Sequence, residues 1–416
     1  MRFVPLSIDL SVVSVVKERR PRKSCLGRTE TVSITLDNDV SYIAAWIAAS
    51  ATIGIAATVC LRTNSIFNDM FTGMTVTPTV SVVMPAFNAA EFIDEAISSI
   101  LEQTFRDFEF IIVDDGSTDN TADILQKYAG ADGRVRVFRQ ANQGVIAALN
   151  CGCRMAQGQF IARMDADDVS LPQRFDRQLE FLKGHPEIGI LGTWASQIDK
   201  QGSVIGTWCL PASPKVLKWT HFFRVGVIHP TVLMRRELLE KVNFYRPEAI
   251  YADDWDLWLR ASAITEFGNT PEILFKYRIS GKNISKRLRQ ECLEAPIKLL
   301  VPFISNFLNE STSIEAVVGL RGNQLASLRQ IQLTAALLEK MYHRFVSKYS
   351  LSSEELNEIS RDAAKKLGCL ALQASRFSGL EFLSLFKRAL RLDYRLMFPS
   401  AILTGLQRRR SLKFAK

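Results

Sequence analysis

The sequence lacks the cysteine pattern of a disulfide scaffold and the glycine loops that most often hold nucleotide phosphates. Its seven cysteines are odd in number and scattered, and Cys151 and Cys153 have no second Cys or His pair at zinc-binding spacing. We therefore expect reduced, buried thiols and no zinc site. Neither G-x-G-x-x-G nor G-x-x-x-x-G-K-[ST] occurs in the chain, so phosphate must be handled in another way.

The body of the chain also lacks excess charge. Of the formal net charge of +9, residues 387–416 carry +8 and residues 1–73 carry +2, which leaves −1 for residues 74–386. A nucleic-acid-binding domain needs a basic face on its folded body, so we expect no nucleic-acid partner. The hydrophobic content of 47% excludes intrinsic disorder, and 416 residues allow roughly two to three domains.

Residues 1–78 form an N-terminal extension whose nature the sequence leaves open. Residues 42–61 are a run of 20 without a charge, which is long enough to span a bilayer. The run is rich in Ala, Gly, Ser and Thr, so its drive to insert is weak, and the flanking bases would place everything downstream outside the cytosol. The alternatives are a buried or amphipathic segment, and translation that begins at Met70 or Met74.

From residue 79 onward, short apolar runs alternate with stretches of helical periodicity. Strands are predicted at 80–84, 108–113, 135–138 and 159–164. Between them, helices are predicted at 89–101, from an N-cap at Thr118 to about residue 128, and at 145–156. This alternation predicts an α/β fold with a mainly parallel sheet sandwiched by helices. Ligands of such sheets bind beyond the carboxyl ends of the strands.

Acidic turns follow two of the predicted strands. Asp114 and Asp115 follow the second strand, and Asp165, Asp167 and Asp168 follow the fourth. Two carboxylates spaced as Asp-x-Asp at a strand end can hold one Mg²⁺ or Mn²⁺ ion and leave positions for substrate phosphates. For Asp168, the alternative is an N-cap of the helix that follows Leu171-Pro172.

Three segments of the chain together resemble family-two glycosyltransferases of the GT-A fold. They read TVSVVMPAFN at 79–88, IVDDGSTD at 112–119 and ARMDADD at 162–168, and the linking residues 142–150 match as well. The resemblance is firm over about 79–194 and continues more loosely to about 280. It implies a Rossmann-like GT-A domain at 79–285 and an inverting transfer of sugar from a nucleotide-sugar donor, most often uridine-diphosphate-linked.

The resemblance also implies a donor site at the strand ends. Asp115, or its neighbour Asp114, would accept a hydrogen bond from the base, and Asp165 would lie near the ribose and the metal. Arg163 would help to neutralise phosphate, with a structural ion pair as an equal alternative. The nucleotide-sugar-binding residues so implied are Pro85, Ala86, Phe87, Asp114, Asp115, Arg163, Asp165 and Ala166.

The same resemblance implies a divalent cation, Mn²⁺ or Mg²⁺, held by Asp165 and Asp167. Asp167 would be the principal ligand and would bridge the metal to the donor diphosphate. The metal would stabilise the charge that develops on the leaving nucleoside diphosphate.

An inverting transfer further needs a base for the acceptor hydroxyl. Members of the family carry an acidic pair, more often Glu-Asp, ahead of an aromatic-rich helix, and here the pair is Asp253-Asp254. The resemblance implies Asp254 as the base and Asp253 as the second choice, with a helix N-cap as the alternative role for Asp253. We expect Trp255 and Trp258 to pack in the core and Asp256 to be solvated.

His229 lies in a strand-like run that ends at Met234. We interpret it as a structural histidine, with a role near the diphosphate or the acceptor as the alternative.

Beyond residue 285 the strand signals end. Residues 286–416 predict a helical extension, with helices at about 287–310, 320–350, 353–377 and 379–394. The segment from 382 to 416 mixes apolar residues with nine bases, so peripheral membrane contact and a packed helix with a solvated tail both remain open.

We expect a cytoplasmic enzyme, associated with the inner membrane if that contact is made, that acts on a glycan or a lipid-linked glycan acceptor. The alternative is a non-catalytic nucleotide-sugar-binding or membrane-associated scaffold, which would be expected to have a compromised metal or base site.

Overall fold

The structure, a computed structural model, describes residues 77–280, 289–321 and 325–394. The apolar run at 42–61 and most of the basic C-terminal segment therefore lie outside the described residues. None of the described helices combines the length and the hydropathy that a bilayer crossing requires. The domain limits expected at 78, 285 and 416 remain predictions.

The first four strands form the parallel half of the sheet. They are β1 (Val80–Ala86), β2 (Phe108–Asp114), β3 (Val135–Arg139) and β4 (Phe160–Arg163). Their spatial order is β3-β2-β1-β4, and all three pairings are parallel. Every residue of β2 and β4 is buried, as expected for strands covered on both faces. The predicted strands and their direction are confirmed, and their carboxyl ends share one edge.

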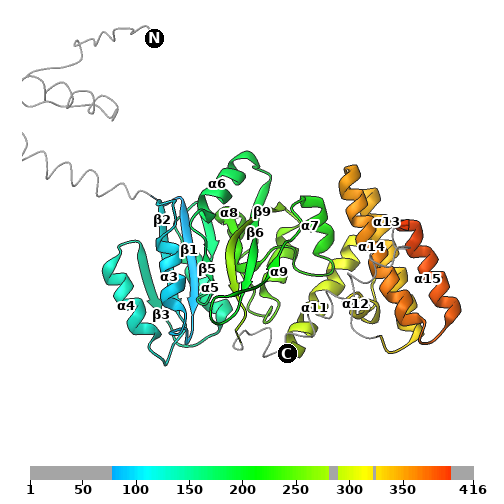
Figure 1. Cartoon of the computed structure of the whole chain (residues 1–416), viewed down its shortest axis with the longest axis horizontal. Coiled ribbons are helices and arrows are strands. Elements are labelled where there is room, and N and C mark those ends of the chain that lie inside the picture. Colours follow the sequence, from blue (N-terminus) through cyan, green and yellow to red (C-terminus); the bar gives the residue numbers. More distant parts are fainter. Residues whose placement is uncertain (1–76, 281–288, 322–324, 395–416) are drawn as a thin grey trace, which may run out of the picture. The chain divides into compact units, whose positions relative to one another are not determined.

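Helices cover both faces of this half, as the sequence predicts (Figure 1). The helices are α3 (Ile93–Leu101), α4 (Thr121–Ala131) and α5 (Val145–Met155). α3 and α4 pack on one face of the strands and α5 on the other, because their buried residues belong to separate apolar clusters. The expected N-cap at Thr118 is wrong. The helix begins three residues later, where the Asp119 carboxylate accepts hydrogen bonds from the backbone and side chain of Thr121.

The second half of the sheet is mixed, which corrects the expectation of a mainly parallel sheet. It contains β5 (Val169–Ser170), β6 (Ile188–Ile198), β7 (Val204–Trp208), β8 (Leu233–Arg235) and β9 (Glu266–Arg278). The described strands form one sheet in the order β3-β2-β1-β4-β8-β6-β9-β5, with β7 paired to β6. β8 runs antiparallel to both β4 and β6, whereas β6 and β9 are parallel.

The helices of this half are α6 (Arg174–Gly184), α7 (Pro214–Thr220), α8 (Arg236–Lys241) and α9 (Asp253–Ala261), with a short 3₁₀ turn, η2 (His229–Thr231). α8 and α9 join α5 on its face of the sheet, where Leu257 and Trp258 of α9 are fully buried. This packing fixes the start of α9, and therefore Asp253 and Asp254, relative to the strand ends.

The C-terminal part is helical, as predicted. Its helices are α11 (Arg289–Leu308), α12 (Ile314–Leu320), α13 (Leu328–Lys348), α14 (Ser353–Ala374) and α15 (Gly379–Leu392). The helix expected at about 320–350 is present as α13 but begins later, and α12 was not predicted. α12 ends at Leu320, and α13 begins at a separate N-cap, Ser327, whose side chain accepts from the Gln330 backbone.

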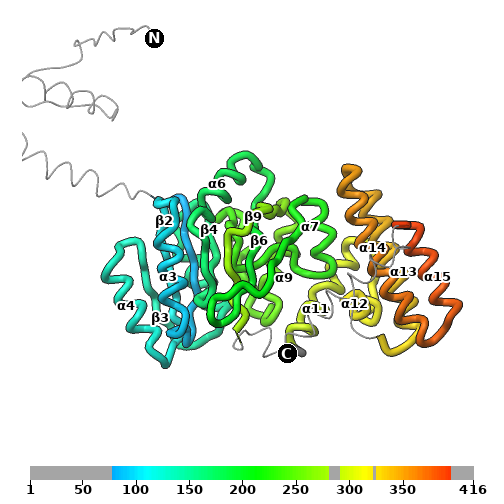
Figure 2. Tube along the Cα trace, viewed as in Figure 1, coloured from blue at the N-terminus to red at the C-terminus, as the bar shows by residue number. Residues whose placement is uncertain are grey.

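The helical part shares its core with the sheet part. Trp219 of α7 and Trp255 of α9 belong to the same buried cluster as Leu338 and Phe345 of α13. Trp219 also donates a hydrogen bond of 2.7 Å from Nε1 to the Asp362 carboxylate of α14. Figure 2 traces the chain from the sheet through α11 into these helices. We infer that the helices brace the two elements, α7 and α9, on which they pack.

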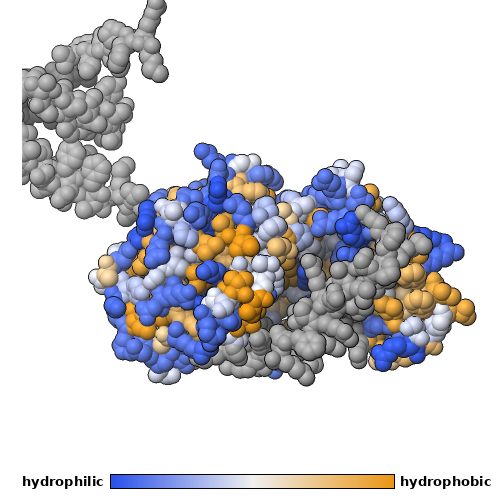
Figure 3. Space-filling view, viewed as in Figure 1, coloured by the Kyte–Doolittle hydropathy of each residue, from blue (hydrophilic) through white to orange (hydrophobic). Residues whose placement is uncertain are grey.

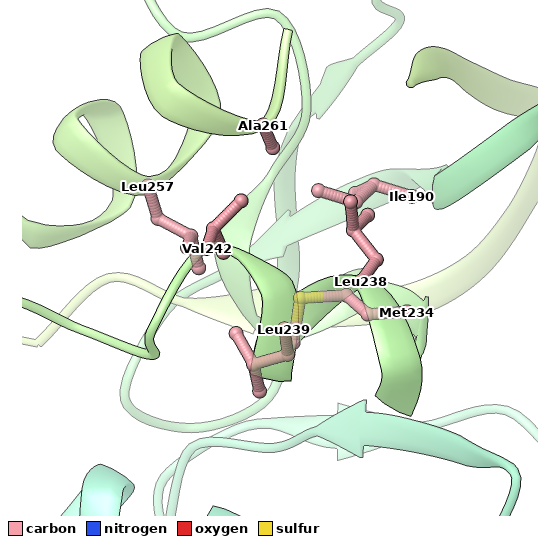
Figure 4. Close-up of a pocket in the computed structure, with 7 residues that line it drawn as sticks. All are labelled: Ile190, Met234, Leu238, Leu239, Val242, Leu257 and Ala261. Carbon is pink, nitrogen blue, oxygen red and sulfur yellow. The ribbon is translucent and has the colours of Figure 1, made fainter. Parts of the chain in front are cut away.

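A small apolar gap lies under α8 and α9 (Figure 4). Its lining is entirely aliphatic or thioether side chains, and it has no room for a water molecule. The lining residues are Ile190, Met234, Leu238, Leu239, Val242, Leu257 and Ala261. A gap without polar groups is a packing imperfection of the core and no ligand site.

Candidate active site

Three carboxylates converge in the loop that follows β4. One oxygen from each of Asp165, Asp167 and Asp168 lies within 4.8 Å of the others. β4 ends at Arg163, so the loop lies at the carboxyl edge of the sheet. Burial, together with the charge of Asp165, raises the pKa of Asp167 to about 6 and raises that of Asp168 as well. Burial and mutual repulsion outweigh the nearby positive charge of Arg163, so a bound cation would stabilise the ionised cluster.

Hard oxygen ligands at this spacing fit a divalent cation of the Mg²⁺ or Mn²⁺ type. The fit has a second indication, because Oδ2 of Asp168 is buried without a hydrogen-bond partner in the described structure. Asp165 and Asp167 are partly exposed and could therefore share a cation with a substrate, whereas Asp168 is buried. The donor set is thus compatible with the predicted metal.

Asp168 also anchors β9. Its Oδ1 accepts a 2.7 Å hydrogen bond from the backbone N–H of Arg278. The alternative role as an N-cap is wrong, since α6 begins only at Arg174 and its N-cap position is Gln173. Asp168 is therefore the carboxylate that ties the acidic loop to the last strand of the sheet.

Arg278 is a residue that sequence reasoning missed. Its guanidinium is buried and donates from Nε to the Asp167 carbonyl at 2.7 Å, while Nη1 lies 3.2 Å from the Asp199 carbonyl. Nη2 pairs with Glu95 of α3. One side chain thus connects the acidic loop, the β6–β7 turn and α3. The sequence shows only an arginine at the end of an apolar strand. That pattern does not reveal the partners of its side chain.

Arg163 forms an ion pair with Asp165 at the end of β4. The arginine is buried, and its Nε has no hydrogen-bond partner in the described structure. The structural ion pair is therefore present, and the phosphate role remains a prediction. Because Arg163 also carries a positive charge towards Asp253, it lowers the pKa of that carboxyl against the effect of burial.

The ends of β1 and β2 bring the expected nucleotide-pocket residues together. Pro85 and Ala86 are the last residues of β1, and Phe87, which follows them, is 49% exposed. The carbonyl of Ala86 accepts a 2.8 Å hydrogen bond from the backbone of Asp115. Ala166 is buried in the loop after β4. An exposed aromatic ring at a strand end is suited to contact a base.

Asp114 and Asp115 are both buried, and both already have protein partners. Asp114 Oδ1 accepts from the Ser117 backbone, and its Oδ2 lies 3.3 Å from Nε of Arg139. The Asp115 carboxylate accepts from the backbone amides of Gln143 and Gly144 and from the side chain of Gln140. The carboxylate of Asp115 therefore holds the turn at residues 140–144 in place.

Asp253 and Asp254 occupy the first turn of α9. Asp253 is the first helical residue and not its N-cap, which is Ala252. Asp254 Oδ1 accepts a 2.6 Å hydrogen bond from the Trp255 backbone. Burial and the charge of Asp254 raise the pKa of Asp253 to about 7, and burial raises the pKa of Asp254. A carboxyl pair whose pKa is shifted towards neutrality is suited to proton transfer.

His229 lies beside this pair. Its Nδ1 is 3.8 Å from Oδ2 of Asp253, and its Nε2 shares a 2.8 Å hydrogen bond with the Tyr245 hydroxyl. Burial holds the pKa of His229 well below its usual range, so the ring is neutral at pH 7. Asn150 of α5 fixes Tyr245 through hydrogen bonds to its backbone N–H and carbonyl. These contacts support the structural interpretation of His229, and a role near the diphosphate or the acceptor remains a prediction.

The remaining residues of the α9 motif pack inward. Trp255 and Trp258 are buried, as expected. Asp256 is buried too, and the expectation of a solvated carboxylate is wrong. Arg260, one helical turn later, pairs with it at 2.7 Å, and Arg246 lies 3.7 Å away. These cations supply the counter-charge that lets a carboxylate be buried.

Comparison with known proteins identifies the family of the chain. Residues 81–242 match the family described as glycosyl transferase family 2. An uncharacterized glycosyltransferase of Haemophilus influenzae is 31% identical over 243 residues, which are 56% of this chain and 75% of that protein. The O-antigen biosynthesis glycosyltransferase WbnJ of Escherichia coli is 31% identical over 238 residues, 55% of this chain and 92% of that protein. The chain belongs to glycosyltransferase family 2.

Among solved structures, residues 1–349 of Staphylococcus aureus TarS in complex with UDP-GlcNAc align with a TM-score of 0.49 and 16% identity. The alignment covers 76% of this chain and 92% of that one. The family match and the relatives in sequence show that the protein is a glycosyltransferase, so the resemblance seen in its sequence is confirmed.

Proposed function

We propose that this glycosyltransferase is a metal-dependent, inverting enzyme that moves one sugar from a nucleotide donor to a hydroxyl of a glycan or lipid-linked glycan. One observation carries the proposal. The carboxylates of the loop after β4 and the acidic pair of α9 meet at the same edge of the sheet, with Arg163 and Asp165 contributing charge at Asp253. The proposed cation ligands and the proposed base are thus close enough to influence each other's charge.

In this proposal Asp165 and Asp167 hold a Mn²⁺ or Mg²⁺ ion. When bound, the cation would stabilise negative charge on the departing diphosphate. Phe87, Pro85 and Ala86 would line the nucleotide pocket, and the 114–115 acidic turn would face the base. A uridine nucleotide is the donor that the family resemblance favours.

The proton would leave through the acidic pair. Asp254 would accept the proton of the acceptor hydroxyl as that oxygen attacks the anomeric carbon and the bond to the diphosphate breaks. Asp253 would remain the second choice, since its carboxylate is the one beside Arg163 and His229. A single displacement of this kind inverts the anomeric centre.

The relative WbnJ is named for O-antigen biosynthesis, which suggests a bacterial surface polysaccharide as the acceptor class. A cytoplasmic location would give the enzyme access to nucleotide sugars.

A panel of nucleotide sugars tests the proposal. We expect one donor to raise the melting temperature only with Mn²⁺ or Mg²⁺, and to release its nucleoside diphosphate when an acceptor is added. Donor binding without any release of nucleoside diphosphate would favour the non-catalytic alternative.

A further inference from the structure

The last described helix, α15, is fixed to the protein by one face. Leu385 and Ala389 on that face are fully buried in the helical core. Arg388 forms a double hydrogen bond to the Glu339 carboxylate of α13, with Nε 2.7 Å from Oε1. These contacts determine the rotation of α15 about its axis, and therefore which of its residues point outward.

The opposite face of α15 points to solvent. Leu380 is 83% exposed and Leu383 is 60% exposed, and Lys387 and Arg391 are exposed as well. At about 100° per residue these four side chains fall within roughly one third of the helix circumference. We call this set the outer face of α15. Its first half is apolar and its second half is basic.

Other exposed apolar side chains stand just before and just after α15 in the sequence. Phe377, in the turn before the helix, is 48% exposed, and Tyr394, just after it, is 70% exposed. Figure 3 shows apolar surface at the end of the protein where α15 lies, beside hydrophilic surface. Exposed aliphatic side chains of this size cost free energy in water and mark contact surfaces when they gather.

The charges around this face are unbalanced. Asp393, the acid at its end, is buried and lies 3.6 Å from Nε of Arg361. Lys387 and Arg391 have no ion-pair partner among the described residues. The sequence after Tyr394 adds six bases and no acid. A partner for this face must therefore accept leucine side chains and offer negative charge.

We propose that the outer face of α15 docks on an anionic phospholipid bilayer. Leu380 and Leu383 would enter the boundary between headgroups and acyl chains, while Lys387 and Arg391 contact headgroup phosphates. Apolar and basic groups on one exposed helix face match the layered chemistry of such a surface. The proposal goes beyond sugar transfer and does not depend on it, because docking requires no donor or acceptor.

Co-sedimentation of the full-length protein with vesicles tests this proposal. Vesicles of phosphatidylcholine with phosphatidylglycerol are compared with phosphatidylcholine alone. We expect binding to the anionic vesicles that weakens as salt is raised. In the double variant Leu380→Glu/Leu383→Glu the partition coefficient should fall at least tenfold, because the burial of two leucine side chains is lost. In Lys387→Glu/Arg391→Glu, each lost base should cost about fivefold.

Ile264→Glu is the matched control. Ile264 is 56% exposed in the turn after α9, so the change adds the charge of one leucine-to-glutamate substitution at an exposed aliphatic site outside α15. Its vesicle binding should equal that of the unaltered protein. Circular dichroism should show native helix content in all variants, since the replaced side chains are largely exposed.

Three results would overturn the proposal. One is the absence of vesicle binding by the unaltered protein. Another is undiminished binding by the leucine variant, which would assign the contact to another segment of the chain. The third is a concentration-dependent dimer, in sedimentation velocity, that the leucine variant converts to monomer without any effect on vesicles.

Discussion

The backbone N–H of Arg278 donates a 2.7 Å hydrogen bond to the Asp168 carboxylate, across 110 positions of sequence. The Arg278 side chain returns to the same loop and donates to the Asp167 carbonyl. The last strand of the sheet therefore determines where the acidic loop stands. A metal site assembled in this way depends on a residue that would not touch the metal.

Replacement of Arg278 by lysine tests this dependence. Lysine keeps the charge but loses the planar fork that reaches three backbone carbonyls and Glu95. We expect weaker Mn²⁺ binding and a loss of about 1–3 kcal/mol in the free energy of unfolding, because buried carbonyls lose their donors. Calorimetric titration with Mn²⁺ and urea denaturation measure the two effects. Mn²⁺ affinity equal to that of the unaltered protein would show that Arg278 does not position the loop.

The acidic loop itself should respond to a cation. Addition of Mn²⁺ at a hundredfold excess over its Kd should stabilise the fold by about 2.7 kcal/mol. Asp167→Asn should abolish most of this effect, and the protein without metal should become no less stable, since a repelling buried charge is removed. Differential scanning fluorimetry records both.

Asp123→Asn provides the control for the loop, because Asp123 is an exposed acid on α4. It should retain the full Mn²⁺ response. A response that survives in Asp167→Asn but is lost in the control would place the cation elsewhere.

The acidic pair of α9 predicts the pH dependence. The pKa of Asp253 is raised to about 7 by burial and by the charge of Asp254, and the two carboxyls titrate as a pair. The base must be ionised, so kcat/KM should fall as pH decreases from 8 to 5. Initial rates at fixed Mn²⁺ measure this limb, and a flat profile over that range would exclude the pair as the base.

The raised pKa of Asp253 has the opposite effect on folding stability: the ionisation that activates the base destabilises the fold. The folded chain holds this proton more tightly than the unfolded chain, whose Asp titrates near pH 4. Ionisation between about pH 4 and 7 therefore destabilises the fold, and the cost is fully present above pH 7. Asp253→Asn should reduce the loss of stability across this window in urea denaturation. An unchanged slope of stability against pH would contradict the raised pKa.

Asp256 offers a test of folding alone. Its carboxylate is buried with Arg260 at 2.7 Å, so Asp256→Asn leaves a buried guanidinium with weaker partners. We expect a loss of about 2–3 kcal/mol in the free energy of unfolding, with the Mn²⁺ response intact. A loss below about 0.5 kcal/mol would show that water and the Val242 and Phe244 carbonyls satisfy Arg260 without the carboxylate.

Strands and short motifs could be predicted from the sequence, whereas contacts between distant segments of the chain could not. The parallel strands follow from continuous apolar runs, and the positions of Asp165, Asp167 and Asp254 follow from motifs within a few residues. The contact of Arg278 with Asp168 and that of Asn150 with Tyr245 join segments about a hundred residues apart, and no local pattern encodes them. The sequence showed a strand-like run ending at Met234 but not its antiparallel direction, because the direction of β8 depends on its pairing with the distant strands β4 and β6.

Asp256 shows a different kind of failure. An acid on a helix was expected to be solvated, although Arg260 stands four residues later and offered a visible partner. Arg246 also approaches Asp256 from a separate loop, and its positive charge helps to offset the cost of burying the carboxylate. This contact could be seen only in the structure.

The most direct test of the central claim is sugar transfer by Asp254→Asn compared with the unaltered enzyme. With the donor identified by binding, and with Mn²⁺ present, product formation is measured under single-turnover conditions. The proposed mechanism predicts that the variant binds donor and metal normally but forms product at least a hundredfold more slowly, because the acceptor proton has no base. Transfer at the unaltered rate by a folded Asp254→Asn protein would contradict it.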